Sequence, residues 1–205
     1  MFDCLIIGGG VSGVSCALVL GSAKEKPFVT GKNTGIILHQ KASMLQEALF
    51  NNAYGIAPGT LGTDLLNQTA ADLKTQYPHI TQIVNERVLS VIKEDDYFLV
   101  TTTQNIYETK IVVVAVNSSN PFTIDGYLQP YVIPHKKSLV KKNRIQLENN
   151  DHLVTENVYV AGTLAGHRSQ LAIAAGSGAA VATDILTLWN NGIETHSHDS
   201  IRVKE

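Results

Sequence analysis

The sequence predicts an α/β fold, a central parallel sheet with an inserted antiparallel β-meander. Two similar patterns, each an apolar strand followed by a glycine turn and a helix of small residues, begin near residues 3 and 158. Between them, residues 80–116 are rich in β-branched and aromatic residues and predict the meander. The length of 205 residues suits one such domain. We expect it to span residues 1–190, built from blocks 1–116 and about 139–190, with a polar tail over 191–205.

The first block opens with a strand–helix–strand unit. Residues 3–7 are typical of a buried parallel strand, residues 11–21 predict a closely packed helix, and residues 27–30 predict a second strand. Residues 31–58 follow as an irregular functional loop with a short helix around 43–49. Residues 60–76 carry leucines at helical spacing.

The later elements follow from residue type and turn signals. The predicted strands are residues 83–84, 88–92, 97–101 and 107–116, of which 111–116 return to the central sheet. Residues 117–157 predict a connector with one strand pair. Residues 158–161 predict a buried strand, and residues 168–189 a long small-residue helix.

The charge balance argues against some classes of partner. Sixteen basic and eighteen acidic residues give a net charge of -2, and the sequence forms no basic stripe, so neither nucleic acid nor a membrane is expected as a partner. A solvated surface is our interpretation of the lysines Lys136, Lys137, Lys141 and Lys142. The uncharged run at 4–23 follows no Lys or Arg and is broken in its middle by Gly8, Gly9, Gly10 and Gly13, which a strand, turn and helix explain better than a signal peptide or membrane span. A soluble, cytoplasmic protein is therefore expected.

Cys4 and Cys16 are the only cysteines, and they are not spaced as Cys-x-x-Cys. Both lie in apolar runs, so we expect buried, reduced thiols that pack as small hydrophobic side chains. Such usage fits a reducing compartment.

The strongest chemical signal is the glycine turn at residues 8–13, Gly-Gly-Gly-Val-Ser-Gly, between a strand and a helix. Gly8 permits the tight turn, Gly10 lets the backbone approach a pyrophosphate, and Gly13 lets helix and strand pack closely. Exposed N–H groups and the helix dipole then hold the phosphates. A glycine turn without a ligand is the alternative, but the position within a strand–helix–strand unit favours a dinucleotide site.

An acidic residue usually ends the second strand of such a site and accepts hydrogen bonds from the ribose hydroxyls. The residues at that place are Thr30, Gly31 and Lys32. Thr30 offers only a hydroxyl, so we expect looser binding at the ribose.

The second pattern consists of Val-Tyr-Val-Ala-Gly-Thr at 158–163 and a helix that starts near Gln170. A helix N-terminus at this place is suited to the negative charge that develops on a reduced flavin ring. The small residues of the helix by themselves indicate only close packing.

Together the two patterns resemble the thioredoxin reductase-like flavoproteins of the pyridine nucleotide-disulfide oxidoreductase superfamily, over most of the chain. The resemblance implies a Rossmann-like FAD-binding domain. Asn52 ahead of a Pro-Gly turn matches the family's Asn-containing loop approximately, and Val88 falls at the strand start whose backbone binds adenine. Gln170, Leu171 and Ala172 match the contact with the flavin ring at a helix start.

Besides the missing acidic residue at Thr30, two motifs depart from the family pattern. Ala115-Val116-Asn117 stands where the family has Ala-Thr-Gly, and Thr163 after Gly162 stands where the family has the Asp that binds the ribityl chain. The residues expected to bind FAD are Gly8, Gly9, Gly10, Val11, Ser12, Gly13, Thr30, Gly31, Lys32, His39, Gln40, Asn52, Val88, Ala115, Val116, Asn117, Gly162, Thr163, Gln170, Leu171 and Ala172.

The family's NADPH domain should follow Asn117, but the connector to about residue 138 is too short for it, and the family's redox Cys-x-x-Cys is absent. The resemblance therefore implies an FAD-dependent oxidoreductase that receives electrons from a separate donor protein or a small-molecule reductant. Its donor, acceptor and catalytic residues stay open, and a homodimer is one candidate for its oligomeric state. The alternative is a non-catalytic flavin- or nucleotide-binding partner or sensor module, which the departures at Thr30 and Thr163 favour.

Histidines supply the remaining candidates. A metal site at His196-Ser197-His198 has no further ligand nearby in sequence, so a solvated tail is preferred and no metal is expected. His39, Gln40 and His167 are candidates to lie near the flavin, with an ordinary polar contact as the preferred alternative.

Overall fold

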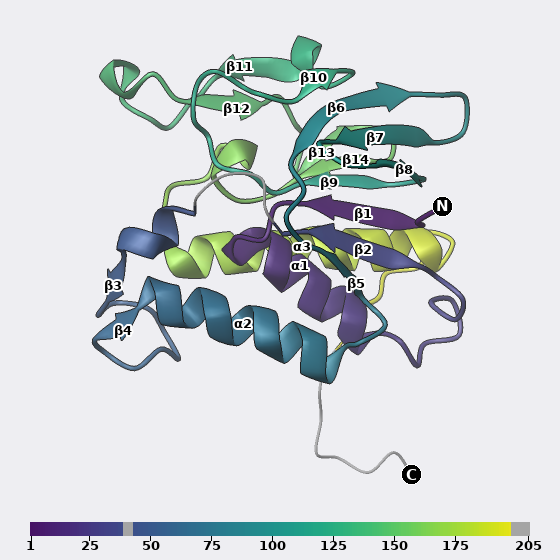
Figure 1. Cartoon of the computed structure of the whole chain (residues 1–205), viewed down its shortest axis with the longest axis horizontal. Coiled ribbons are helices and arrows are strands. Elements are labelled where there is room, and N and C mark those ends of the chain that lie inside the picture. The colour runs from purple at the N-terminus through teal and green to yellow at the C-terminus, as the bar shows by residue number, and fades with distance from the viewer. Residues whose placement is uncertain (39–42, 198–205) are drawn as a thin grey trace.

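A six-stranded sheet forms the centre of the molecule in the computed structural model, which describes residues 1–38 and 43–197 (Figure 1). Its strand order is β13-β14-β9-β1-β2-β5, with all neighbours parallel except the edge pair β13–β14. The strands are β1 (Cys4–Ile7), β2 (Thr34–Ile37), β5 (Thr81–Ile83), β9 (Val112–Val114), β13 (Leu153–Thr155) and β14 (Val158–Val160). Strands from both ends of the chain therefore share one sheet.

Three helices cover one face of this sheet and a smaller sheet covers the other (Figure 1). The helices are α1 (Val11–Ser22), α2 (Gly62–Gln76) and α3 (Leu171–Trp189). The smaller sheet has the order β10-β6-β7-β8 and contains the antiparallel meander. Its strands are β6 (Val88–Lys93), β7 (Phe98–Thr102), β8 (Ile106–Thr109) and β10 (Asp125–Gly126).

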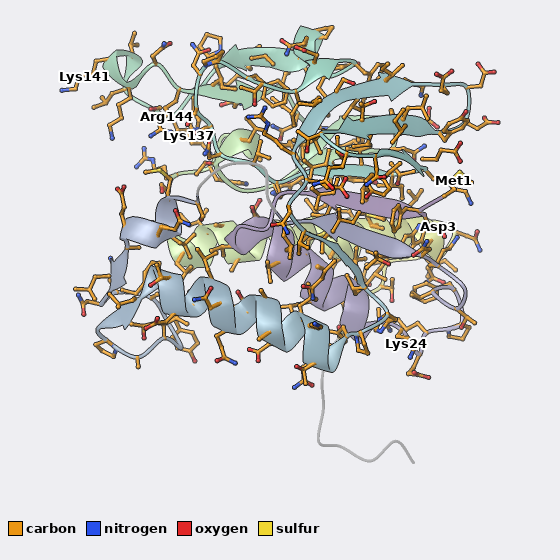
Figure 2. The ribbon with its side chains drawn as sticks, viewed as in Figure 1. Met1, Asp3, Lys24, Lys137, Lys141 and Arg144 are labelled. Atoms are coloured by element: carbon orange, nitrogen blue, oxygen red, sulfur yellow. The ribbon has the colours of Figure 1, made fainter. Side chains whose placement is uncertain are left out.

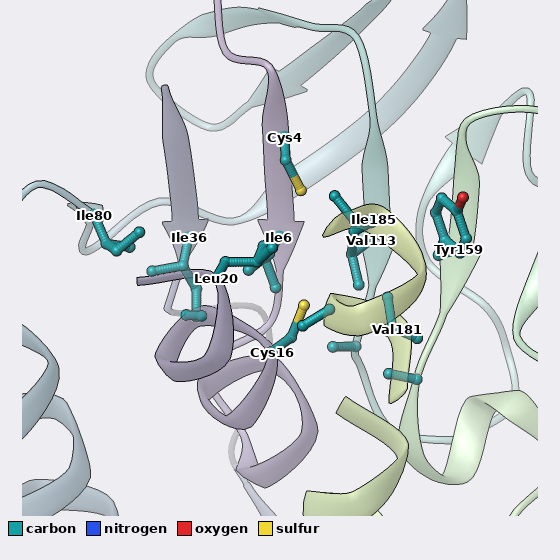
Figure 3. Close-up of a cluster of buried hydrophobic side chains, with 14 of the residues drawn as sticks. Cys4, Ile6, Cys16, Leu20, Ile36, Ile80, Val113, Tyr159, Val181 and Ile185 are labelled. Atoms are coloured by element: carbon teal, nitrogen blue, oxygen red, sulfur yellow. The ribbon is translucent and has the colours of Figure 1, made fainter. Parts of the chain in front are cut away.

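Alternating side chains of β1 divide the core between the two faces. Cys4 and Ile6 pack with α1 and α3, as Figure 3 shows, whereas Leu5 and Ile7 pack towards the meander. This alternation is a property of any strand, and here both faces are apolar because both are covered.

The remaining elements are short. Two hairpins are formed by β3 (Leu49–Phe50) with β4 (Thr60–Leu61), and by β11 (Val132–Pro134) with β12 (Ile145–Leu147). The 3-10 turns are η1 (Met44–Glu47), η2 (Gln129–Tyr131), η3 (Val140–Lys142) and η4 (Gly162–Ala165).

Most of the predicted elements are confirmed, including the return of the chain through β9 to the central sheet. The connector carries the expected strand pair, β11–β12, and also the edge strands β10 and β13. Among the described residues it contains no second nucleotide-binding fold. The predicted strand at 107–116 is two strands, because the chain leaves the meander after β8 and enters the central sheet as β9.

The prediction of a second strand at residues 27–30 is wrong. These residues form turns, with Val29 N–H donating to the Lys26 carbonyl and Gly31 at φ +79. The strand lies later, at β2, where Thr34 pairs with Cys4. The second strand lies between two others in a sheet that is covered on both faces. Ile36 and Ile37 suit this position because they are branched and apolar, whereas Pro27 lacks an N–H to donate to a neighbouring strand.

Helix α3 is long and apolar enough to cross a membrane, by length and composition alone. In the fold it packs against α1 and buries Val181, Ala182, Ile185 and Leu186 in the core. One face of α3 therefore belongs to the core, and 33% of its apolar window is buried.

Candidate functional site

The predicted glycine turn connects β1 to α1 beside the carboxyl ends of β2 and β9. Gly8 has φ +117, and a Cβ there would lie 2.5 Å from the Ala115 carbonyl oxygen. A Cβ at Gly13 would lie 1.9 Å from the Gly8 carbonyl oxygen. The tight turn at Gly8 and the close packing at Gly13 are therefore confirmed.

Gly10 differs from its neighbours, because a Cβ built there meets no atom within 4 Å. It is the N-cap of α1, and the first hydrogen bond of the helix runs from Val14 N–H to the Gly10 carbonyl, at 2.9 Å. The preceding N–H groups of Val11 and Ser12 have no partner within the helix and are available to an anion. The space in front of Gly10 is part of a cavity.

This cavity has a volume of about 470 Å³ and lies at the carboxyl ends of the central strands. From β1 the strand order continues to β2 on one side and to β9 on the other, so the order of the sheet reverses at this point. Ligands of open α/β sheets bind at such a point. The predicted residues that line it are Gly8, Gly9, Gly10, Val11, Ser12, Ala115, Val116, Asn117, Gly162, Thr163, Gln170 and Leu171.

A second helix begins at the same cavity. Gln170 is the N-cap of α3, and both Gln170 and Leu171 line the cavity. Within the described residues, neither α1 nor α3 has a side-chain cap or an acidic residue in its first turn. Two positive helix ends therefore meet in one cavity, which favours a ligand with negative charge at two places.

Several lining residues were not predicted. They come from η1 and the loop around it, from one face of α2, and from the start of α3, and they are Leu38, Ser43, Met44, Leu45, Gln46, Ala48, Phe50, Leu66, Asn67, Ala70, Ser169 and Ala174. The sequence predicted α2 and a short helix near η1. Residues 31–58 were also predicted as a functional loop, but which side chains of these segments line the cavity depends on packing between distant parts of the chain.

Other predicted residues lie elsewhere. Thr30, Gly31 and Lys32 precede β2 and line a separate hollow of about 250 Å³ at the amino end of that strand, whereas the cavity lies at the carboxyl ends of the strands. Their expected place followed from the misplaced second strand. The chain beyond β2 continues through Leu38, and the candidates His39 and Gln40 lie outside the described residues.

Four further predicted residues do not line the cavity. Gly13 lies behind the turn, and Ala172 is exposed one residue beyond Leu171. Asn52 is exposed in the loop between β3 and β4, and Val88 begins β6 with its side chain fully buried.

The Gly162 turn rests on a network of side chains. Ser177 Oγ accepts a hydrogen bond from the Gly162 N–H at 2.8 Å and lies 3.0 Å from His152 Nε2. His152 Nε2 in turn lies 3.1 Å from His167 Nε2. His167 thus makes the ordinary polar contact that was its preferred interpretation, and it is not among the lining residues. Burial, with the nearby His152 and Lys137, lowers the pKa of His167.

Both cysteines are fully buried free thiols on the helix side of the sheet (Figure 3). Burial raises the pKa of the Cys4 and Cys16 thiols, so neither forms a thiolate readily. Their predicted burial is confirmed. No group of three or more His, Cys, Asp or Glu suited to a metal occurs in the part of the chain that the structure describes.

Comparison with known proteins places this cavity in context. A ferredoxin–NADP reductase from Streptococcus sanguinis is 30% identical over 121 residues, which cover 57% of this chain and 35% of that protein. An uncharacterized oxidoreductase, CzcO, from Bacillus velezensis is 28% identical over 171 residues, covering 79% of this chain and 48% of that protein. The chain thus spans between a third and a half of the length of these curated relatives.

A thioredoxin reductase structure from Gloeobacter violaceus superposes with a TM-score of 0.68 at 13% identity, covering 98% of this chain and 99% of that chain. This likeness shows the fold, a Rossmann-like α/β domain. Residues 2–166 match the family described as pyridine nucleotide-disulphide oxidoreductase. The chain therefore belongs to the pyridine nucleotide-disulphide oxidoreductase family.

Proposed function

We propose that this chain binds FAD in the cavity between the two glycine turns and acts as the flavin-carrying domain of an oxidoreductase. The single observation that carries the proposal is the open space in front of Gly10, where the N–H groups that begin α1 face the cavity. A pyrophosphate would accept hydrogen bonds from Gly10, Val11 and Ser12 there. No side chain competes for that space.

The residues present fit the remainder of the cofactor. Thr163, Gln170 and Leu171 also line the cavity, and the start of α3 would stabilise negative charge on the flavin ring. Ala115, Val116 and Asn117 continue the end of β9 into the wall between the two turns. The bound flavin supplies the electron-transfer chemistry, and these residues bind, orient and shield it.

A separate electron donor is part of the proposal. Cys4 and Cys16 are the only cysteines of the chain, and both are fully buried, so this chain offers no thiol pair to relay electrons to a disulfide. Electrons would then come from another protein or a small-molecule reductant. Membership of an oxidoreductase family supports this over a non-catalytic sensor module.

The first prediction concerns the cofactor. Protein purified without added flavin should be yellow, and heating should release FAD and not FMN, because the α1 end of the cavity is needed only for a dinucleotide. The visible absorbance spectrum measures the flavin content, and chromatography of the released flavin distinguishes FAD from FMN. A colourless protein that takes up no FAD on reconstitution contradicts the proposal.

The second prediction concerns the donor. FAD-loaded protein mixed anaerobically with excess NADH or NADPH should bleach slowly and without saturation. Hydride transfer needs the nicotinamide held with its reacting atom about 3–3.5 Å from the flavin, and no second nucleotide-binding fold occurs among the described residues. Stopped-flow absorbance measures the rate. Rapid, saturable bleaching by either nucleotide would refute the need for a separate donor.

A further inference from the structure

Positive charge is concentrated on one hairpin. Between Gly126 and Leu147 the sequence has five basic residues and no Asp or Glu, whereas the chain as a whole is slightly acidic. Lys137, Lys141 and Arg144 lie at one end of the molecule (Figure 2). We call the β11–β12 hairpin with its connecting residues 135–144 the basic hairpin. None of the ion pairs between described residues involves it.

The apex of the basic hairpin is apolar. Val140, the first residue of η3, is 96% exposed, and Leu139 before it is 61% exposed. Exposed lysines lie on both sides of this pair in sequence, at Lys137 and Lys141. Exposure of two aliphatic side chains to water is energetically unfavourable, and neither side chain is part of the domain core. Such exposed apolar side chains are typical of a surface that contacts something else.

A second, uncharged projection lies at the same end of the molecule, where Figure 1 shows β3 and β4. Residues 49–61 contain no charged residue. Tyr54 at its turn is fully exposed, and Leu49 and Leu61 are about half exposed on the paired strands. We call this segment the uncharged hairpin.

Residues beside both projections line the cavity. On one side η1 and Phe50 of the uncharged hairpin line it. On the other, Gly162 and Thr163 of η4 line it, and η4 packs against β12 of the basic hairpin, where Gln146 Oε1 also accepts a hydrogen bond from Lys136 N–H. Both projections are therefore connected to the cavity wall.

We propose that this end of the molecule docks on a bilayer that contains anionic phospholipid. Leu139, Val140 and Tyr54 would enter the headgroup boundary, and the lysines of the basic hairpin would contact lipid phosphates. Protein interfaces are depleted in Lys and enriched in Arg, Met and aromatic residues at their centres, whereas this apex is aliphatic and lysine-rich. A bilayer also requires no matching shape from two separate convex tips.

The net charge of -2 gave the opposite expectation, because it averages over the chain. A local field acts within about a Debye length, roughly 8 Å at physiological ionic strength, so the basic hairpin is not cancelled by acidic residues elsewhere. The proposal is independent of the cofactor and concerns only the two hairpins.

Vesicle sedimentation of the full chain tests the proposal. The protein should sediment with vesicles of phosphatidylcholine and phosphatidylglycerol, and not with phosphatidylcholine alone, and added salt should release it. Lys141→Glu with Lys142→Glu should weaken binding at least about thirty-fold, the effect of two lysines at an anionic surface. Val140→Ser should weaken it several-fold without changing the charge.

A matched control separates local from total charge. Lys24 and Lys74 are exposed lysines outside both hairpins, and Lys24 lies at the opposite end of the molecule in Figure 2. Lys24→Glu with Lys74→Glu changes the net charge equally and should keep at least half of the binding. Thermal unfolding should show that all variants are folded. Absence of binding to anionic vesicles at low salt, as expected for a protein partner instead, overturns the proposal, and so does equal loss in the control variant.

Discussion

Two glycine turns, one after β1 and one after β14, lead from strands to helices at the same edge of the central sheet. They are stabilised by different contacts. In the turn after β1, Gly8 and Gly13 pack against backbone atoms, and the space in front of Gly10 is left open. In the turn after β14, the Gly162 N–H is bound by a side chain, Ser177 Oγ, from α3. The first turn is held by backbone contacts to the ends of the neighbouring strands, so the space in front of Gly10 stays free for a ligand.

The two turns are also joined to each other. A Cβ at Gly162 would lie 2.7 Å from Ser12 Oγ, and a Cβ at Gly178 would lie 1.9 Å from the Ser12 carbonyl oxygen. Close approach of α1 and α3 at these glycines therefore sets the distance between the two helix ends. Substitutions at each turn can show whether the first serves binding and the second serves support.

The largest effect is expected at Gly13. Gly13→Ala forces a methyl group to within 1.9 Å of the Gly8 carbonyl oxygen, and backbone on both sides cannot yield easily. We expect a loss of about 3 kcal/mol in the free energy of unfolding, measured by urea denaturation. Gly176→Ala is the matched control, because it lies within α3 with no atom within 4 Å of its Cβ position.

The control should gain up to about 1 kcal/mol, since alanine favours a helix over glycine. Equal stability of the Gly13→Ala variant and the wild-type protein would show that α1 can shift away from the turn. The comparison between the turns would then lose its structural basis.

Gly10 should separate binding from stability. Gly10→Val places its side chain in open space, so the free energy of unfolding without FAD should change by less than about 1 kcal/mol. FAD affinity should fall about a hundred-fold, because the side chain blocks charge-assisted hydrogen bonds to the pyrophosphate. Fluorescence titration with FAD measures the affinity. Unchanged affinity would mean that any flavin binds elsewhere.

The same contrast explains what the sequence could predict. Each glycine of the first turn has a backbone role tied to its spacing within six residues, so the spacing alone indicated Gly8, Gly10 and Gly13. The second turn depends on Ser177 and His152. These residues lie 15 and 10 residues from Gly162 in the chain and come into contact only in the folded protein. Such contacts have no local pattern.

The misplacement of the second strand has a different cause. Residues 27–30 and β2 are both short and apolar, and propensity could not decide between them. The register of β2 with β1 is fixed by burial on both faces, which is a tertiary effect. Because the strand was misplaced, Thr30, Gly31 and Lys32 were expected at its carboxyl end, whereas they precede β2.

The smallest effect is expected at Ser177, and it is the sharpest test of the second turn. Ser177→Ala leaves the Gly162 N–H without an acceptor among the described residues and removes the contact of His152 Nε2 with a hydroxyl. We expect a loss of about 2 kcal/mol in the free energy of unfolding, the penalty for an unsatisfied buried donor. Ser15→Ala is the control, because Ser15 Oγ also joins α1 to α3 but donates to the Ala175 carbonyl, which lies within a helix. Removal of the Ser15 hydroxyl leaves no buried donor without an acceptor, so the free energy of unfolding should fall by less than about 1 kcal/mol. If both variants lose the same stability, the side chains behind the second turn add nothing beyond ordinary helix packing.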